Sequence, residues 1–546
     1  MTKQPEKRAL REISKVVRRA SRMPTDKFAN AIVDVWQTCQ DSEKVLLSAV
    51  LALSDAGLLE KALDVVHQAL AIQGETVVIL SLLGKISKDM NDFETGEKLF
   101  VRLVQVDPTN SEAYAHLVEV LRKQEKNDQA LELAQSAVGQ FPDNADLWNQ
   151  LGLLAQHTLN DLAAAKEFYH QALKLSYRNA NYAHNLSGVL SKTDSALFWS
   201  EAALKWAPHN SQINLSHALL LFAQGSVEDG WRHYEYRKDP KLGSSKASKF
   251  DHSFPSWQGE SLDGKTIVVC AEQGVGDEVF FLSAFVPLVA QAGQVFVVCD
   301  PRLTDIVQRS FPQVVAFPYE DVVEFGMRFR RFPKLDQHLE EWQAKPDYFA
   351  LFGDVMRNFY GTPEAFMALP TPYLRPSEEL VEKYESQFDN AKKKIGISWR
   401  SGNMRRERKR MYLDLQLFMD LSSKVDADFY VLQYTMSEEE RAALDKCQNI
   451  HCFDDVDLKA DIEANLALMH HLDVVIGPPV ATQSFAAAVG TPVWLVNKGK
   501  PWSFMGQDRL PSFYAEGSRY WCSHDYLNEE EKLVSDLAEA LKNIEG

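Results

Sequence analysis

The sequence predicts an α + α/β fold, in which a long α-helical repeat array precedes an α/β region. Between residues 42 and 240 the sequence repeats with a period close to the roughly 34 residues of helix-turn-helix arrays. From Lys265 to Ala271 the pattern changes to a short β-rich run, followed by a glycine turn and a helix. The same pattern restarts at Lys394, so we expect two α/β lobes in tandem, each with a parallel sheet.

The repeats place small and large apolar residues at recurring positions. Proline recurs just past an expected helix end at Pro108, Pro142 and Pro208. Small residues such as Gly84 and Gly152 suit the points where paired helices cross closely, and large residues fill the grooves between neighbouring hairpins. These positions resemble the tetratricopeptide repeat over about six units. The resemblance implies a superhelix that binds a peptide or protein on its concave face, with a purely structural spacer as the alternative.

These pattern changes divide the chain into six segments. The predicted order is basic N-terminal capping helices (1–41), the tetratricopeptide α-solenoid (42–240), a linker (241–264), a first Rossmann-like lobe (265–378), a second Rossmann-like lobe (379–528) and a C-terminal helix (529–546). Within the lobes, strands are expected at 265–271, 294–299, 394–399, 429–433, 474–476 and 493–496. We expect the acidic C-terminal helix to pack back across the first lobe.

Charge and cysteine content limit the classes of partner. A formal net charge of −17 argues against nucleic acid, because that binding depends on phosphate neutralisation. Residues 1–22 carry a local excess of positive charge, which suits a solvated capping helix or contact with an acidic partner or membrane surface. The six cysteines include no pair at the CxxC spacing of metal sites, as in proteins of reducing compartments. With no apolar stretch that resembles a signal or transmembrane segment, we expect a cytoplasmic protein.

The strongest local motif is AEQGVGDE, residues 271–278, which lies between an expected strand and an apolar helix. Gly274 and Gly276 let the backbone approach a ligand, and the start of the helix favours an anion. The motif lacks the third glycine of a dinucleotide fingerprint and the GK[ST] of a P-loop. Asp277 and Glu278 at the mouth of a cleft would provide a general base for an acceptor hydroxyl. The alternative is that Asp277 only caps the helix.

Three runs then resemble one protein family. GSVEDGWRHYEYR (225–237), FPSWQGESLDGKTIVV (254–269) and EQGVGDEVFFLSAFVPLV (272–289) are similar to bacterial tetratricopeptide-repeat glycosyltransferases. The catalytic lobes of that family are similar to heptosyltransferases of the GT-B fold, and IGISWRSG (395–402) resembles the first strand of their donor lobe. The resemblance implies that Asp277 acts as the base and that a nucleotide-sugar is a substrate, with no resident cofactor.

The second lobe contains a cluster of positive charge. Six cations fall within eleven residues, and Glu407 is the one acidic residue among them: Arg400, Arg405, Arg406, Arg408, Lys409 and Arg410. Such a cluster in an acidic chain indicates a phosphate or diphosphate clamp, with a solvated charged loop as the alternative. By resemblance, Arg400, Lys409 and Arg410 match donor-binding positions. The residues expected to line the nucleotide-sugar site are Gln273, Gly274, Gly276, Arg400, Ser401, Gly402, Asn403, Lys409, Arg410, Gln433, Gly477, Thr482, Gln483 and Ser484.

One segment departs from the family pattern. Where related transferases read roughly VDTAVAHLAGALG, this chain has GPPVATQSFAAAVG at residues 477–490, with Pro479 at the Asp position and Ser484 at the His position. Either the donor differs from the common diphospho-sugars, or the lobe no longer catalyses. The first alternative is supported by a subgroup with this two-part layout that transfers nonulosonic acids from a CMP donor, with one phosphate, to Ser or Thr of flagellin.

Metal chemistry is not expected. Asp426-Ala427-Asp428 has the DxD form of metal-dependent transferases but precedes a strand, and His470 and His471 are adjacent, so they project to different sides of a helix. The sequence therefore predicts a metal-independent GT-B glycosyltransferase acting on Ser/Thr hydroxyls of a protein, flagellin being the candidate acceptor. The alternatives are a non-catalytic adaptor and a transferase for a glycan or lipid acceptor.

Overall fold

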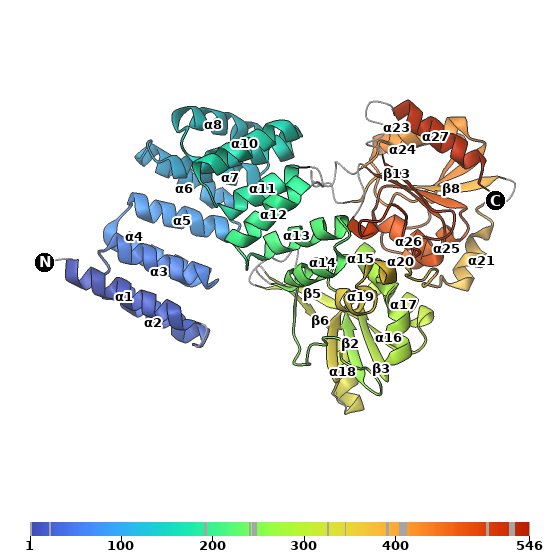
Figure 1. The fold of residues 1–546 in the computed structure, drawn as a ribbon, viewed down its shortest axis with the longest axis horizontal. Helices are drawn as coiled ribbons and strands as arrows, with labels where there is room; N and C mark the ends of the chain where they lie inside the picture. Colours follow the sequence, from blue (N-terminus) through green and yellow to red (C-terminus); the bar gives the residue numbers. More distant parts are fainter. Residues whose placement is uncertain are drawn as a thin grey trace. The chain divides into compact units, whose positions relative to one another are not determined.

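The computed structural model describes residues 3–20, 23–190, 194–239, 242, 248–324, 327–343, 345–388, 392–402, 412–497, 502–522 and 530–544. It consists of two compact units, Met1–Ala207 and Pro208–Gly546. The first unit is an all-helical tetratricopeptide solenoid, and the second contains parallel sheets, so the predicted α + α/β fold class is confirmed (Figure 1).

Successive helices of the first unit pair as antiparallel hairpins. The close crossings form at the predicted glycines: a β-carbon on Gly84 would lie 2.8 Å from the Phe100 ring, and one on Gly152 would overlap the Tyr169 ring. The helices are α1 (Lys3–Arg19), α2 (Thr25–Gln37), α3 (Glu43–Asp55), α4 (Leu59–Gln73), α5 (Val77–Asp89), α6 (Phe93–Val106), α7 (Ser111–Lys123), α8 (Asn127–Gln140), α9 (Ala145–Leu154), the π-turn η2 (Ala155–Leu159), α10 (Leu162–Leu175), α11 (Ala180–Val189) and α12 (Asp194–Trp206).

The second unit begins with one more helical hairpin. Its helices are α13 (Ser211–Ala223) and α14 (Val227–Tyr234), followed by the short helix η3 (Glu235–Lys238). The repeat spacing placed this hairpin in the solenoid, but its aromatic residues Phe222, Trp231 and Tyr234 share a hydrophobic core with the α/β lobes. The hairpin is therefore part of the same compact unit as the sheets.

The first lobe is built on a four-stranded parallel sheet in the order β4-β3-β2-β7. A small sheet, β1-β6-β5, lies beside it, and β1 falls in the predicted linker, where it pairs with β6. The elements are β1 (Ser248–Phe250), β2 (Thr266–Cys270), α15 (Val275–Leu282), α16 (Phe285–Gln291), β3 (Gln294–Cys299), η5 (Pro301–Leu303), α17 (Thr304–Ser310), β4 (Val314–Pro318), β5 (Glu320–Glu324), β6 (Met327–Arg331), α18 (Pro333–Trp342), β7 (Tyr348–Leu351), α19 (Phe352–Tyr360) and α20 (Pro363–Met367).

The second lobe contains a six-stranded parallel sheet in the order β10-β9-β8-β11-β12-β13. In order along the chain this is 3-2-1-4-5-6, the strand order of dinucleotide-binding folds, which bind ligands at the carboxyl ends of the central strands. The elements are α21 (Glu378–Glu385), β8 (Lys393–Ile397), α23 (Leu415–Lys424), β9 (Ala427–Val431), α24 (Glu438–Leu444), β10 (Ile450–Cys452), α25 (Ile462–His470), β11 (Val474–Gly477), α26 (Ala481–Val489), β12 (Val493–Asn497), η6 (Trp502–Phe504), β13 (Arg519–Cys522) and α27 (Glu530–Lys542).

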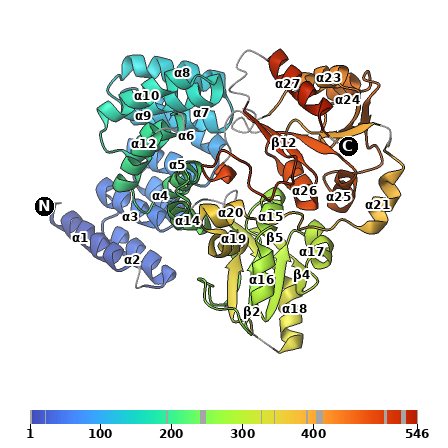
Figure 2. The same cartoon turned by 45° about the vertical axis from the view of Figure 1, so that its right-hand side comes forward.

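The C-terminal helix α27 does not pack across the first lobe, so that expectation is wrong. Its apolar face, with Leu533, Leu537 and Leu541, joins the core of the second lobe, and α27 lies beside α23 in both views (Figures 1 and 2). Lys393 at the start of β8 donates to the Leu541 carbonyl oxygen at 2.9 Å. The helix thus covers one face of the sheet in its own lobe.

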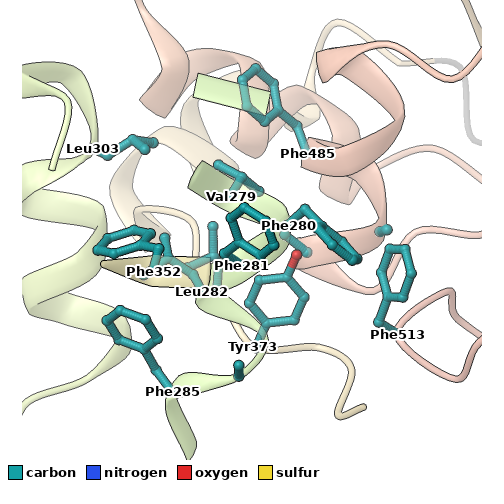
Figure 3. Packing of buried hydrophobic residues seen from close by; sticks show 14 of the residues in the cluster. Val279, Phe280, Phe281, Leu282, Phe285, Leu303, Phe352, Tyr373, Phe485 and Phe513 are labelled. Atoms are coloured by element: carbon teal, nitrogen blue, oxygen red, sulfur yellow. The ribbon is translucent and has the colours of Figure 1, made fainter. Parts of the chain in front are cut away.

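The two lobes share a continuous hydrophobic core. Phe280 of α15 packs against Phe513 of the second lobe at a ring-centroid distance of 5.0 Å, while Phe285 packs inside the first lobe against Phe352 at 4.8 Å. Figure 3 shows these side chains around α15, with Phe485 of α26 nearby. Within the described part of the chain, no helix is long and apolar enough to cross a bilayer.

Candidate functional site

The glycine turn lies at the carboxyl end of β2, a central strand of the first lobe's sheet. Gly274 is the N-cap of α15, and its carbonyl oxygen accepts from the backbone nitrogens of Asp277 at 2.9 Å and Glu278 at 3.0 Å. No side chain caps this helix end. Asp277 is therefore not the N-cap; it stands in the first turn and is half-buried. The helix start favours the ionised form of a carboxylate at this position.

Glu278 does not lie at the mouth of a cleft, contrary to the sequence prediction. It is 1% exposed and points into the first lobe, where it accepts from the Asp300 backbone nitrogen at 2.9 Å and the Tyr319 hydroxyl at 2.8 Å. The Arg330 Nη1 atom lies 3.7 Å from the Glu278 Oε1 atom. Burial raises the pKa of Glu278 to about 7, although Arg330 and the two hydrogen bonds oppose the rise. The described partners of Glu278 thus lie within the first lobe.

Among the described residues, Arg400, Gly477, Thr482, Gln483 and Ser484 follow the carboxyl ends of β8 and β11, the point where the strand order reverses. Gly477 ends β11, and a β-carbon there would overlap the Gln483 amide and the Ser398 carbonyl oxygen. Gln483, in the first turn of α26, donates to the Ser398 hydroxyl at 3.0 Å. Its side-chain oxygen is buried and has no hydrogen-bond partner among the described residues. Thr482 is also buried, and Ser484 is half-buried.

Gln433 supports the backbone that follows β8. Its side-chain oxygen accepts from the backbone nitrogens of Trp399 at 3.2 Å and Arg400 at 3.1 Å, and the residue is 2% exposed. Ser401 shares a 2.6 Å hydrogen bond with the Tyr412 hydroxyl, and the Gly402 backbone nitrogen donates to the Tyr434 hydroxyl at 2.5 Å. These contacts fix residues 399–402, where the described part of this segment ends.

Arg400 forms an ion pair that the sequence did not reveal. Its guanidinium donates to both carboxylate oxygens of Glu440, at 3.2 and 2.5 Å, and the Trp399 indole donates to the same carboxylate at 2.8 Å. Glu440 belongs to the capping box of α24. Two of the hydrogen bonds that the Arg400 guanidinium donates are therefore made within its own lobe. Asn403, Lys409 and Arg410, with the rest of the cationic cluster, lie outside the described residues.

The glycine turn and the start of α26 come together between the lobes. A β-carbon on Gly276 would lie 3.0 Å from both the Cα and the Cβ of Ala481. The helices α15 and α26 lie side by side in both views, and α26, like α15, has no side-chain cap at its N-terminus (Figures 1 and 2). Two positive helix ends therefore meet at the carboxyl edges of two parallel sheets, an environment suited to an anionic ligand.

The sequence also missed a buried ion-pair network behind the glycine turn. Arg237 of η3 donates to Glu272 at 3.1 Å and to Asp354 at 2.7 Å, and all three side chains are buried. Burial raises the pKa of Glu272, whereas Arg237 and Lys238 together overcome burial and hold the pKa of Asp354 at about 2. The only signal in the sequence was the charged aromatic run 225–237, which indicated a family and no role.

Two cavities in the described part of the chain lie away from this junction. One of about 620 Å³ is lined by residues 508–521, and one of about 400 Å³ lies between α14 and the segment from Arg357 to Ala365. Neither is lined by Asp277 or by the first turn of α26. Among the described residues, no group of three or more His, Cys, Asp or Glu side chains is placed to hold a metal ion. The convergence of strand ends and helix starts is the better guide.

Comparison with known proteins identifies the repeats. Residues 87–156 and 145–179 match family descriptions of the tetratricopeptide repeat. The chain contains tetratricopeptide repeats. Over 474 residues it is 29% identical to protein FlbA of Caulobacter vibrioides, a match that covers 84% of this chain and 78% of FlbA.

Solved structures similar to this chain match about a third of it. A thermophilic TPR protein of Thermus thermophilus, TTC0263, is 22% identical, with a TM-score of 0.31, over 33% of this chain and 99% of its own. PilF of Pseudomonas aeruginosa is 16% identical, with a TM-score of 0.29, over 37% of this chain and 90% of its own.

Proposed function

We propose that this protein is a glycosyltransferase of GT-B type that transfers a sugar from a nucleotide donor to a side-chain hydroxyl of a protein bound by the repeats. The observation that carries the proposal is the meeting of the α15 and α26 N-termini at Gly276 and Ala481. This junction offers a phosphate the positive ends of two helices, and it holds Asp277 in the first turn of one of them.

In this mechanism Asp277 takes the proton of the acceptor hydroxyl as its oxygen bonds to the anomeric carbon of the sugar. The bond from that carbon to the phosphate oxygen breaks, and the nucleotide leaves with the electron pair. The helix starts stabilise the negative charge that develops on the leaving phosphate. The buried amide of Gln483 lies at one of these starts, in the first turn of α26. No resident metal or cofactor is required in this scheme. The repeats provide the protein-binding surface, because tetratricopeptide arrays bind partners on their concave face.

The donor proposed is CMP-activated, with a nonulosonic acid as the sugar and a flagellin as the acceptor. The pairing of Arg400 with Glu440 supports this choice, because a cation already neutralised within the protein contributes less to clamping a diphosphate. Pro479 and Ser484, which replace the Asp and His of related transferases, also fit a donor with one phosphate.

Thermal unfolding of the full chain with CMP, UDP, GDP and ADP tests the proposal, since a ligand that binds the folded state raises its stability. CMP is expected to give the largest upward shift. Transfer of the corresponding sugar to a flagellin is then followed by mass spectrometry. The adaptor alternative is favoured if no nucleotide shifts the transition and no sugar is transferred, and the other acceptor classes are favoured if only a glycan or lipid is modified.

A further inference from the structure

The hairpin formed by α13, α14 and η3 packs against both α/β lobes. Phe222 and Tyr234 lie against Trp502 of the second lobe, at ring-centroid distances of 5.7 and 6.4 Å. A β-carbon on Gly506 would overlap the backbone of Gly225, so the turn after α13 touches the loop after η6 directly. The hairpin is therefore held by the interlobe core and belongs structurally to the candidate site.

The same hairpin makes polar contacts with the two residues that precede the glycine turn. Arg237 pairs with Glu272 at 3.1 Å, and the Tyr234 hydroxyl accepts from the Gln273 side-chain nitrogen at 2.5 Å. Tyr234 is 4% exposed, so water does not compete for this hydrogen bond. Gln273 is adjacent to Gly274, the residue whose carbonyl oxygen accepts from the Asp277 backbone nitrogen.

The Tyr234 hydroxyl also lies within electrostatic range of the proposed base. Burial raises the pKa of the Tyr234 phenol well above its ordinary value. Arg237 and the hydrogen bond from Gln273 oppose the rise, and the negative charges of Asp277 and Glu272 add to it. The Tyr234 hydroxyl therefore remains neutral. It comes from the helical hairpin, whereas Asp277 comes from the first lobe.

We propose that Tyr234 is a positioning residue for the transfer reaction: by holding Gln273 through its hydroxyl, it fixes the glycine turn that carries Asp277. This inference rests on the proposed function, because it assigns Asp277 the role of base. It deepens that function by making the helical hairpin of the second unit part of the transfer site. The hairpin then supplies one support of the catalytic turn.

The test compares Tyr234→Phe with Tyr236→Phe in the full chain. Both substitutions remove one phenol hydroxyl from the same segment. Among the described residues, however, the hydrogen bond of the Tyr236 hydroxyl is a long one of 3.4 Å to the Pro208 carbonyl oxygen, and not one with Gln273. Phenylalanine at 234 retains the ring that packs on Phe222 and Trp231. We expect Tyr234→Phe to lower kcat about 10-fold, with KM for the donor within about 2-fold of wild type.

A double-mutant cycle with Gln273→Ala checks that the effect passes through Gln273. If it does, the double variant is no slower than the slower single variant. Effects of Tyr234→Phe and Gln273→Ala that multiply independently overturn the proposal, as does an unchanged kcat in Tyr234→Phe. Equal losses in Tyr234→Phe and Tyr236→Phe also overturn it.

Amide hydrogen exchange separates this inference from the proposed function, because it requires neither donor nor acceptor. Faster exchange at residues 273–277 in Tyr234→Phe, but not in Tyr236→Phe, supports the positioning role even if wild type transfers no sugar. Unchanged exchange in this segment overturns the inference, whatever the activity of wild type. The absence of transfer in wild type, by contrast, counts against the proposed function alone.

Discussion

Gly276 and Ala481 approach so closely that only a glycine fits at position 276 without displacement. A β-carbon there would lie 3.0 Å from two Ala481 carbon atoms, whereas a β-carbon on Gly274, two residues earlier, would meet nothing within 4 Å. One glycine therefore serves the contact between lobes, and the other leaves the helix start open. The same turn provides a matched pair of substitutions.

Gly276→Ala is expected to lower the free energy of unfolding by roughly 1–3 kcal/mol, the usual cost of forcing a methyl group into a packed contact. Nucleotide affinity is expected to fall with it, because the two helix starts are pushed apart. Gly274→Ala is the control and is expected to change stability by less than about 1 kcal/mol. Urea unfolding of both variants measures the effect on stability, and calorimetry of Gly276→Ala measures the effect on nucleotide affinity. Equal losses of stability in the two variants would contradict the interlobe contact.

Asp277→Asn is expected to reduce sugar transfer by roughly two to four orders of magnitude, since it removes the base and retains the shape of the side chain. Nucleotide affinity is expected to stay close to that of wild type. Asp305→Asn is the control, because Asp305 is also an acidic residue in the first turn of a helix of the same lobe. Transfer near the wild-type rate in Asp277→Asn would contradict the assignment of Asp277 as the general base.

Ionisation of the buried Glu278 is expected to lower the free energy of unfolding as the pH rises. Its pKa is about 7 in the folded protein against an ordinary value of 4.5, so the folded state binds more protons between these values. The contribution of Glu278 to the free energy of unfolding is therefore fully present below about pH 4.5. It is lost as the pH rises through 7, by about 3 kcal/mol in total. Glu278→Gln is expected to remove this dependence, because glutamine does not titrate.

The measurement for Glu278 is the difference in unfolding free energy between wild type and Glu278→Gln from pH 5 to pH 8. A difference is needed because burial lowers the pKa of His217 to about 4, which makes stability rise with pH in an overlapping range. Glu320→Gln, a change at an exposed carboxylate on β5, is expected to keep the wild-type slope. A pH-independent difference between wild type and Glu278→Gln would show that Glu278 is ionised throughout.

The sequence predicted the interior strands of the two larger sheets and missed their edge strands and the small sheet. β2, β3, β8, β9, β11 and β12 were all expected within a few residues, because buried parallel strands are continuous apolar runs. β5 and β6 were missed because EDVVE and MRFRR are too charged to read as strands. Their charges are satisfied only in three dimensions, as when Arg330 pairs with Asp321 at 2.8 Å.

At the candidate site, the sequence located the two turns but could not assign individual side chains. The glycines and the helix starts follow from local pattern, and they lie where predicted. The direction of Glu278, which faces away from the junction, depends on contacts with Tyr319 and Asp300 that are distant along the chain. The partner of Arg400 is likewise 40 residues away. Tyr234 and Arg237 were missed because they lie in a segment that the repeat spacing assigned to another domain.

A truncation distinguishes the boundary predicted from the sequence from the one in the structure. A chain that begins at Pro208 keeps Phe222, Trp231 and Tyr234 in the shared core and Arg237 in its network, so it is expected to fold and bind nucleotide. A chain that begins at Phe250 loses these residues and leaves the buried carboxylates of Glu272 and Asp354 without Arg237. Removing one partner of a buried ion pair costs about 3–5 kcal/mol, before the loss of apolar packing is added. This shorter chain is expected to show no cooperative thermal unfolding.

Arg237→Met in the full chain is the companion variant, since it removes the charge and keeps most of the side-chain volume. It is expected to lower the unfolding temperature. Both chains are compared by circular dichroism during heating and by calorimetry with the nucleotide that stabilises the full chain most. Cooperative unfolding and full nucleotide affinity in the chain from Phe250 would mean that the hairpin is dispensable for the α/β fold.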